Sequence, residues 1–369
     1  MRKVIGKVTG HRLFLSLFCL LLVLLVNLIK DVSFFDVSIN EQGVLYGRIV
    51  DILNRGSEIA ILAVGMTLVI AASGGPDISV GSVMSLSACF GCMLLAGFGV
   101  KTTEVLQMPL ILGIIFGILM GGLAGAFNGL LVSRLKLQPM IATLILFTAG
   151  RAIGLLLCNN MMIYIRYEPY KFIGNFMKFG DWTCPIPTPI FVTAIVVVIT
   201  AIILRKTTLG LYVQSVGING RASRLLGINS AKIIFICFVI CGLCAGVAGI
   251  VSSSRIYSAD PNSIGKDYEL DAILAVALGG NSLAGGKFNM SGSIVGAYTI
   301  QAITVTLLAM GVSTDQAPVI KAIIVIAIVA IQSPVFKEWV GRLRNHRQTA
   351  TLAKDSDVHV IGISERGEM

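Results

Sequence analysis

Residues 109–133 read PLILGIIFGILMGGLAGAFNGLLVS, a run of 25 residues without a charged side chain. A bilayer core of about 30 Å requires roughly 20 apolar residues in a helix that rises about 1.5 Å per residue. Within this run, glycine recurs at every fourth position, at Gly113, Gly117, Gly121, Gly125 and Gly129. Helices in lipid associate through close packing of small residues, so the run predicts a central membrane helix with a ridge for helix packing.

The chain as a whole is also rich in apolar residues and poor in charged ones. Of its 369 residues, 55% are hydrophobic and only 13% are charged, whereas soluble domains carry about 25% charged residues. Ten apolar segments are predicted as spans, with bounds near 13–29, 57–72, 80–97, 109–133, 139–158, 188–204, 232–252, 270–285, 289–311 and 317–333. The predicted fold is an all-α polytopic membrane protein with about ten transmembrane helices.

The basic residues predict the orientation of these spans. A cytoplasmic N-terminus places 18 Lys and Arg inside and 9 outside, as the positive-inside rule requires. Residues 1–12 are then a cytoplasmic N-terminus, 13–333 the transmembrane domain and 334–369 a cytoplasmic polar tail. The loop 205–231 contains basic but no acidic residues and is the most securely cytoplasmic. The first span, which lacks a cleavage pattern, is expected to be a retained anchor.

The net charge of +10 does not indicate nucleic acid, because the basic residues stand at the ends of apolar segments, where they face lipid headgroups. The nearest approach to a phosphate loop, residues 285–288, reads GGKF and lacks the Ser or Thr that would bind Mg²⁺. Cys237, Cys241 and Cys244 have ligand-like spacing, but one apolar span with glycines favours helix packing over a metal site. We expect no catalytic residues, metal or cofactor in this chain.

Two glycine-rich segments interrupt the spans. The first break, residues 74–81, reads GGPDISVG, and the second break, residues 279–286, reads GGNSLAGG. Each follows a similar apolar segment, ILAV at 61–64 and at 273–276, which suggests an internal duplication. Broken helices in matching halves of a membrane protein indicate a transport path. Two ordinary tight turns between helical hairpins are the alternative.

Residues 217–228, GINGRASRLLGI, predict a two-turn helix in the cytoplasmic loop. Asn219 is placed to cap its start and Gly227 to end it in the left-handed conformation. So short a helix is unstable alone and must dock on something. A partner protein is the favoured surface, and lipid headgroups are the alternative. The residues expected to make that contact are Gly217, Asn219, Arg221, Ala222, Arg224, Leu225, Leu226 and Gly227.

These motifs resemble the ribose/xylose/galactose-type permeases of ABC importers. The resemblance covers about residues 50–333 and rests on GMTLVI at 65–70, DISVGS at 77–82, the loop just described and LDAILAV at 270–276. DILNR at 51–55, AGR at 149–151 and GKFN at 286–289 are most similar to the galactofuranose importer permease. Two departures are Pro76, where the family commonly has Ile, and Ser223, where it has a second Ala.

The resemblance implies a type II importer bundle in a bacterial plasma membrane, working by alternating access. It implies three partners: a second, identical or different permease subunit, a cytoplasmic double-domain ATPase that holds ATP and Mg, and an extracytoplasmic sugar-binding protein. Residues 217–228 would be the coupling helix that enters the ATPase. Candidates for the sugar path are polar groups at or near the breaks, namely Asp77, Ser79, Asn128, Asn281, Ser282 and Gln301.

Two rival functions stay open on the sequence alone. A branched-chain amino-acid permease belongs to the same class, and a stand-alone secondary transporter would need a buried titratable relay, for which Asp77 and Arg151 are the candidates. Arg151, deep in a predicted span, is expected to pair with Asp271 or Glu58, or to reach the interface.

Overall fold

The computed structural model describes residues 14–40, 43–180 and 182–332, which are mostly helical. They divide into two units, one through Ala317 and the other from Pro318 onward. The predicted cytoplasmic N-terminus, 1–12, and polar tail, 334–369, lie outside the described residues. The second unit contains nearly all of helix α13 (Ala317–Gln332).

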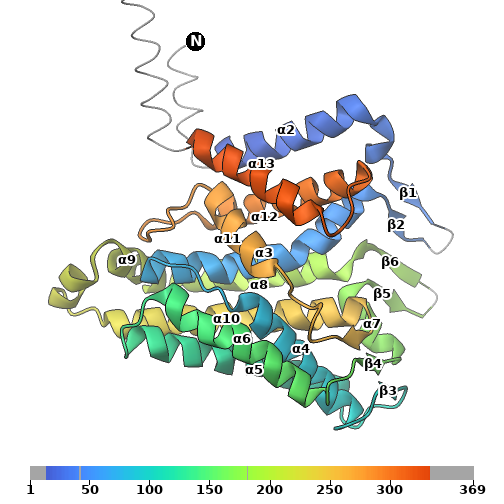
Figure 1. Cartoon of the computed structure of the whole chain (residues 1–369), viewed down its shortest axis with the longest axis horizontal. Helices are drawn as coiled ribbons and strands as arrows, with labels where there is room; N and C mark the ends of the chain where they lie inside the picture. The colour runs from blue at the N-terminus through green and yellow to red at the C-terminus, as the bar shows by residue number, and fades with distance from the viewer. Residues whose placement is uncertain (1–13, 41–42, 181, 333–369) are drawn as a thin grey trace, which may run out of the picture. The chain divides into compact units, whose positions relative to one another are not determined.

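The first unit carries the remaining helices and the short strands (Figure 1). Its main helices are α2 (Phe14–Lys30), α3 (Arg48–Ser73), α4 (Val80–Ala96), α5 (Leu110–Ser133), α6 (Pro139–Leu157), α8 (Thr188–Lys206), α9 (Leu209–Leu225), α10 (Ser230–Arg255), α11 (Tyr268–Leu278) and α12 (Met290–Ala309). Its shorter elements are η1 (Val32–Phe35), α7 (Glu168–Gly174), β1 (Ser38–Ile39), β2 (Leu45–Tyr46), β3 (Thr102–Thr103), β4 (Ile163–Ile165), β5 (Phe176–Phe179), β6 (Trp182–Pro187) and β7 (Ser258–Ala259).

Six of the ten predicted spans form helices long and apolar enough to cross a membrane, counted over the described residues. These are α3, α5, α6, α8, α10 and α12. The predicted spans 13–29, 80–97, 270–285 and 317–333 form shorter helices. The largest difference is α11, whose 11 residues extend only about 16 Å. It ends at Leu278 because the second break begins at the next residue.

Helix α3 is the most buried of the six long helices. In its most apolar window 94% of residues are buried, compared with 33% in α5. A helix that is apolar all round is typical of the interior of a bundle, and α3 packs against α8, α10, α11 and α12. The prediction that residues 109–133 are central therefore holds for one face only, because α5 buries its glycine ridge and exposes residues such as Ile111 and Leu123.

Short strands gather at one end of the first unit, and α9 lies at the other (Figure 1). Strand β4 pairs in parallel with β3 and antiparallel with β7, with Tyr164 opposite Thr102 and Ser258. Strands β1 and β2 form one hairpin and β5 and β6 another. Because α9 belongs to the predicted cytoplasmic loop, the strand-bearing end is called the outer end below and the α9 end the inner end.

Candidate functional site: the two breaks and the coupling helix

The first break holds a buried carboxylate. Asp77 is 2% exposed, and its Oδ1 accepts hydrogen bonds from the backbone N (2.9 Å) and the Oγ (2.6 Å) of Ser79. From α5, Asn128 Nδ2 donates to Ser79 Oγ at 2.7 Å. Three of the predicted path residues therefore lie together. Asn128 Oδ1 is buried and accepts no hydrogen bond within the described part of the chain.

The second break is held by Asn281, another predicted path residue. Its Nδ2 donates to Ser293 Oγ on α12 at 2.9 Å and to the Val276 carbonyl at 3.1 Å, while its Oδ1 accepts from the backbone N of Asn289. Ser293 Oγ also accepts from Thr67 of α3 at 2.7 Å. These bonds replace the helical pattern that the break interrupts, and they join the break to α3.

The other two predicted path residues lie apart from these networks. Ser282 Oγ accepts from the backbone N of Ala284 at 3.2 Å in an exposed part of the second break. Gln301 is buried on α12 and packs close to Gly56, in the outer half of α3. Gly56 stands 15 residues before Ala71, about 22 Å along the helix. The structure therefore does not join Gln301 to the breaks.

The inner end of α3 meets both the second break and the predicted coupling helix, residues 217–228, through backbone atoms. Gly286 N donates to the Ala71 carbonyl at 3.0 Å. A Cβ added at Gly217 would collide with that same carbonyl and lie 2.7 Å from Gly286 N. A Cβ added at Gly285 would lie 3.0 Å from Gly74 Cα. We call the contact among Ala71, Gly217 and Gly286 the inner node.

The coupling helix, residues 217–228, has the predicted caps. Asn219 has non-helical backbone angles (φ −156°, ψ 96°) that divide α9, and its Oδ1 accepts from Arg221 N and Ala222 N, both at 3.0 Å. Gly227 ends the turn with φ +80°, a conformation that favours glycine. The two-turn helix is therefore confirmed, and its docking on a partner stays a prediction.

The coupling helix presents an apolar and basic surface. Leu225 and Leu226 are 90% and 80% exposed, and Arg221, Ala222 and Arg224 are also exposed. Such exposure of two neighbouring leucines indicates a contact surface. Ser223 points the other way: it is buried, and its Oγ donates to the Asn219 carbonyl at 2.9 Å. The departure from a second Ala at this position thus faces the body of the protein rather than the exposed surface.

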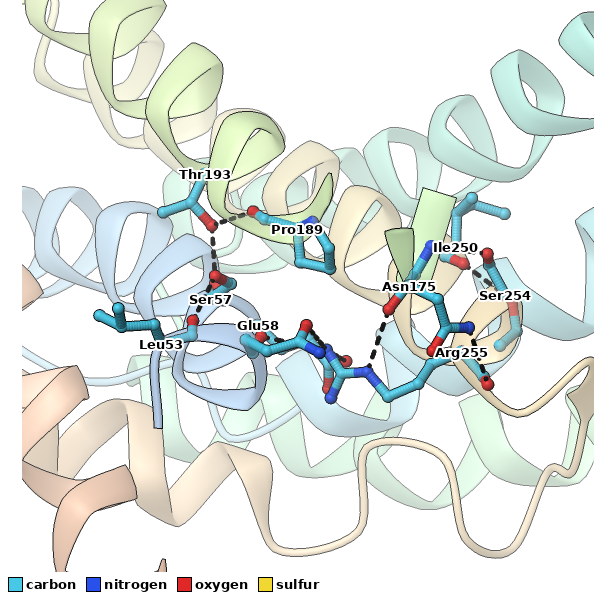
Figure 2. Close-up of polar contacts among 12 residues, drawn as sticks. Leu53, Ser57, Glu58, Asn175, Pro189, Thr193, Ile250, Ser254 and Arg255 are labelled. Carbon is cyan, nitrogen blue, oxygen red and sulfur yellow. Dashed lines mark hydrogen bonds and ion pairs between the residues drawn. The ribbon is translucent and has the colours of Figure 1, made fainter. Parts of the chain in front are cut away.

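The outer half of α3 carries a buried ion pair that the sequence analysis missed. Arg255 Nη2, at the end of α10, lies 3.0 Å from Glu58 Oε1, and Tyr268 Oη of α11 donates to Glu58 Oε2 at 2.8 Å. Arg255 Nη2 also donates to the carbonyl and the Oδ1 of Asn54, both at 3.1 Å. Figure 2 shows Arg255 extending toward Glu58 beside Asn175, which donates to the Arg255 carbonyl at 3.3 Å. We call these residues the outer cluster.

Arg151 has different partners from those expected. Its guanidinium donates to three carbonyls of the segment that leads into α11, those of Pro261 (3.2 Å), Ile264 (3.2 Å) and Gly265 (3.0 Å). The expectation of Glu58 as its partner is wrong, because Glu58 pairs with Arg255. Carbonyl oxygens can satisfy a guanidinium in a membrane protein, so Arg151 fixes this segment against α6.

The glycine ridge of α5 packs on α10 and α4. All five of its glycines are buried. A Cβ at Gly121 would collide with the Gly242 carbonyl and lie 2.9 Å from Gly246 Cα, and one at Gly125 would collide with the Phe238 carbonyl. Toward the outer end, Gly113 faces Leu95 and Gly117 lies near Ile250 and the Ser87 carbonyl. This contact lets the backbones of α5 and α10 approach closely, as in small-residue packing generally.

A bundle of apolar helices with two interrupted helix pairs is the architecture expected of a membrane permease. The comparisons agree: residues 48–329 match the family described as Branched-chain amino acid transport system / permease component, and the chain belongs to this family. It is a multi-pass membrane permease component.

The similarity to known proteins covers nearly the whole chain. The galactofuranose transporter permease protein of Escherichia coli strain K12 is 39% identical over 335 residues, 90% of this chain and 93% of that protein. The fructose import permease protein of Bifidobacterium longum strain NCC 2705 is 33% identical over 355 residues, 95% and 96% of the two chains. The ribose import permease protein of Escherichia coli strain K12 is 33% identical over 318 residues, 86% and 92%. No solved structure matches the chain.

Proposed function

We propose that this chain is the permease subunit of a bacterial ATP-driven importer and forms the path of a monosaccharide across the plasma membrane. The observation that carries the coupling part of this proposal is the inner node. There Gly217, two residues before the cap of the exposed two-turn helix, lies against both the end of α3 and the second break. A displacement of the coupling helix is therefore transmitted by steric contact to the two elements that frame the path.

The proposed partners follow from what this chain has on its surface. The exposed leucines and arginines of the coupling helix suit a cleft with an apolar floor and acidic rim in a cytoplasmic double-domain ATPase, which would hold ATP and Mg. A second permease subunit and an extracytoplasmic sugar-binding protein complete the importer. ATP binding closes the ATPase, the coupling helix moves, and the path changes the side to which it is open.

A sugar is the favoured substrate because the relatives reported above are named for galactofuranose, fructose and ribose. The polar groups at the breaks are mostly neutral amides and hydroxyls, and the single carboxylate, Asp77, is satisfied by Ser79. Buried acceptors such as Asn128 Oδ1 can bind sugar hydroxyls without a charge, which suits weak and transient binding along a path.

Transport in proteoliposomes tests this proposal. The chain is reconstituted with the ATPase and the binding protein of its own system, and uptake of radiolabelled D-galactose, D-fructose, D-ribose and L-leucine is measured. We expect uptake of at least one sugar that requires ATP and both partners and survives a proton uncoupler. Uptake of leucine without any sugar would favour the branched-chain amino-acid function that the family description names. Uptake by the chain alone, driven by an ion gradient, would overturn the proposal.

A further inference from the structure

A pocket of about 380 Å³ lies at the outer end of α3, within the range of roughly 300–1,000 Å³ that small-molecule sites occupy. Its wall is built by the first two turns of α3, by the hairpin of β1 and β2, by residues 175–176 and by Arg255. It stands at the end of α3 opposite the inner node. Neither the breaks nor the coupling helix contributes to it.

The polar groups of this pocket supply both donors and acceptors. Asp51, Asn54 and Arg55 come from consecutive turns of α3, and Asn175 faces them from the chain after α7. A sugar hydroxyl both donates and accepts, so it requires such a mixed wall. Asn54 is half-buried and held in place, because its Oδ1 accepts from Arg255 Nη2 at 3.1 Å. A fixed polar group binds with less loss of conformational entropy than a mobile one.

The charges of the pocket balance. The Arg255 side chain, 15% exposed, is neutralised by Glu58 at 3.0 Å, and Asp51 offsets Arg55 in the exposed part of the wall. Net balance disfavours a simple anion or cation and suits a neutral, hydroxyl-rich ligand. Tyr46 and Phe176 add aromatic surface to the same wall, which can cover the apolar face of a sugar ring.

We infer that this pocket is an outer sugar-binding subsite, in which Asp51 and Asn54 hydrogen-bond the hydroxyls of one monosaccharide before it enters the path beside α3. The inference rests on the proposed function and adds a location and two binding residues to it. It also gives the outer cluster a second role, because Arg255, fixed by Glu58, orients Asn54 toward the ligand. Arg255 is a positioning residue here.

Protection from a thiol reagent tests the subsite directly. Seven of the eight cysteines, all in the described part of the chain, are buried, and Cys184 is partly exposed, so the background is Cys184→Ser. Val50→Cys places a thiol in the pocket wall without removing a proposed ligand. Lys101→Cys, exposed next to β3, is the control. The complex is labelled in proteoliposomes with a membrane-impermeant maleimide, with and without the sugar that it transports.

We expect the sugar to slow labelling of Val50→Cys about threefold at twice its dissociation constant, by mass action, and to leave Lys101→Cys unchanged. Adding Asp51→Ala should raise the sugar concentration for half protection about tenfold, the loss of one good hydrogen bond to a ligand. Glu104→Ala, another exposed acid at the outer end, should not change that concentration.

Three outcomes would overturn the subsite. These are labelling of Val50→Cys that no transported sugar slows, equal slowing at Lys101→Cys, and protection by L-leucine instead of sugar. Wild-type uptake of the same radiolabelled sugars is measured first. If the wild-type complex transports none of them, the proposed function has failed; if it transports one without protecting Val50→Cys, the subsite alone has failed.

Discussion

The two ends of α3 are held in opposite ways. At the outer end, the charged side chains of Glu58 and Arg255 meet in a nearly dry setting, with Glu58 1% exposed. At the inner end, the contacts of the inner node are made by backbone atoms, with glycine at two of its three positions. One end depends on a specific charge pair and the other on the absence of side chains.

This difference suggests that the two ends of α3 serve different functions. A buried ion pair matters chiefly for stability, because removing one partner leaves the other charge buried and unpaired. A backbone contact without side chains transmits displacement with little compliance, because packed backbones do not deform continuously. We therefore expect substitutions at the outer end to change stability most, and substitutions at the inner node to change coupling most.

The largest effect is expected at the outer cluster. Glu58→Leu leaves Arg255 buried without its partner, and breaking a buried pair typically costs about 3–5 kcal/mol. The midpoint of thermal unfolding of the purified protein in detergent should fall markedly. Adding Arg255→Leu should recover much of the loss, because removing both charges removes the buried unpaired one.

The exposed pair of Arg48 and Asp31, with side chains 40% and 46% exposed, provides the matched control. Asp31→Asn removes the charge but keeps an acceptor for Ser33 N, which Asp31 Oδ1 caps at 3.0 Å, so it should change stability by only about 0–1 kcal/mol, as for surface pairs generally. If Glu58→Leu were no more destabilising than Asp31→Asn, the outer end would not be held by charge.

A smaller loss of stability is expected from substitutions at the glycine ridge of α5. Gly121→Ala places a methyl group against the Gly242 carbonyl and 2.9 Å from Gly246, and overpacking of this kind costs about 1–3 kcal/mol. Gly154→Ala on α6 is the control, because its nearest neighbour would be Cys89 Sγ at an ordinary 3.5 Å. Equal thermal midpoints of the two variants would show that the α5–α10 contact is not tight.

At the inner node, Gly217→Ala should cost stability through the same kind of overpacking as Gly121→Ala, and it should in addition reduce transport by the folded complex. The added methyl collides with the Ala71 carbonyl and lies 2.7 Å from Gly286 N, so the coupling helix must shift away from α3. Sugar uptake per ATP hydrolysed should fall about tenfold, within the usual range of coupling energies of about 1–3 kcal/mol. Gly220→Ala, three residues along and with its nearest neighbour at 3.7 Å, should transport normally. Equal uptake by both variants would contradict the proposed role of the node.

The sequence predicted those features that depend on neighbouring residues. The caps at Asn219 and Gly227 follow from side-chain chemistry within one turn, and the structure has both. The packing ridge of α5 follows from its repeat of four. The second break was also predicted, yet α11 is shorter than the span 270–285. The residues after Leu278 are small and uncharged, so a hydropathy plot extends the span through them. The backbone, however, leaves the helix after Leu278 and reaches φ +76° at Gly280.

Features that depend on distant residues were not predictable. Glu58 and Arg255 are 197 positions apart in the sequence, and only the packing of α10 on α3 brings them together. The predicted start of the second span at residue 57 also placed Glu58 at a helix end, whereas α3 begins at Arg48. Arg151 was expected to pair with a carboxylate or to reach the interface, but a loop supplies carbonyls instead. Which acceptor meets a buried guanidinium is decided by tertiary structure.

The smallest expected effect separates the two contributions of the coupling helix, its shape and its attachment. Asn219→Ala removes the cap on two backbone N–H groups, those of Arg221 and Ala222, and the loss of such a cap costs about 1 kcal/mol. Amide hydrogen exchange over residues 220–225 should then become about fivefold faster, while the inner node, which involves Gly217 rather than the cap, stays in place. Asn219→Asp keeps the acceptor and should exchange like the wild type. If sugar uptake falls with Asn219→Ala as far as with Gly217→Ala, the turn itself rather than its contact with α3 transmits the movement, and the contrast between the two ends of α3 would no longer explain coupling.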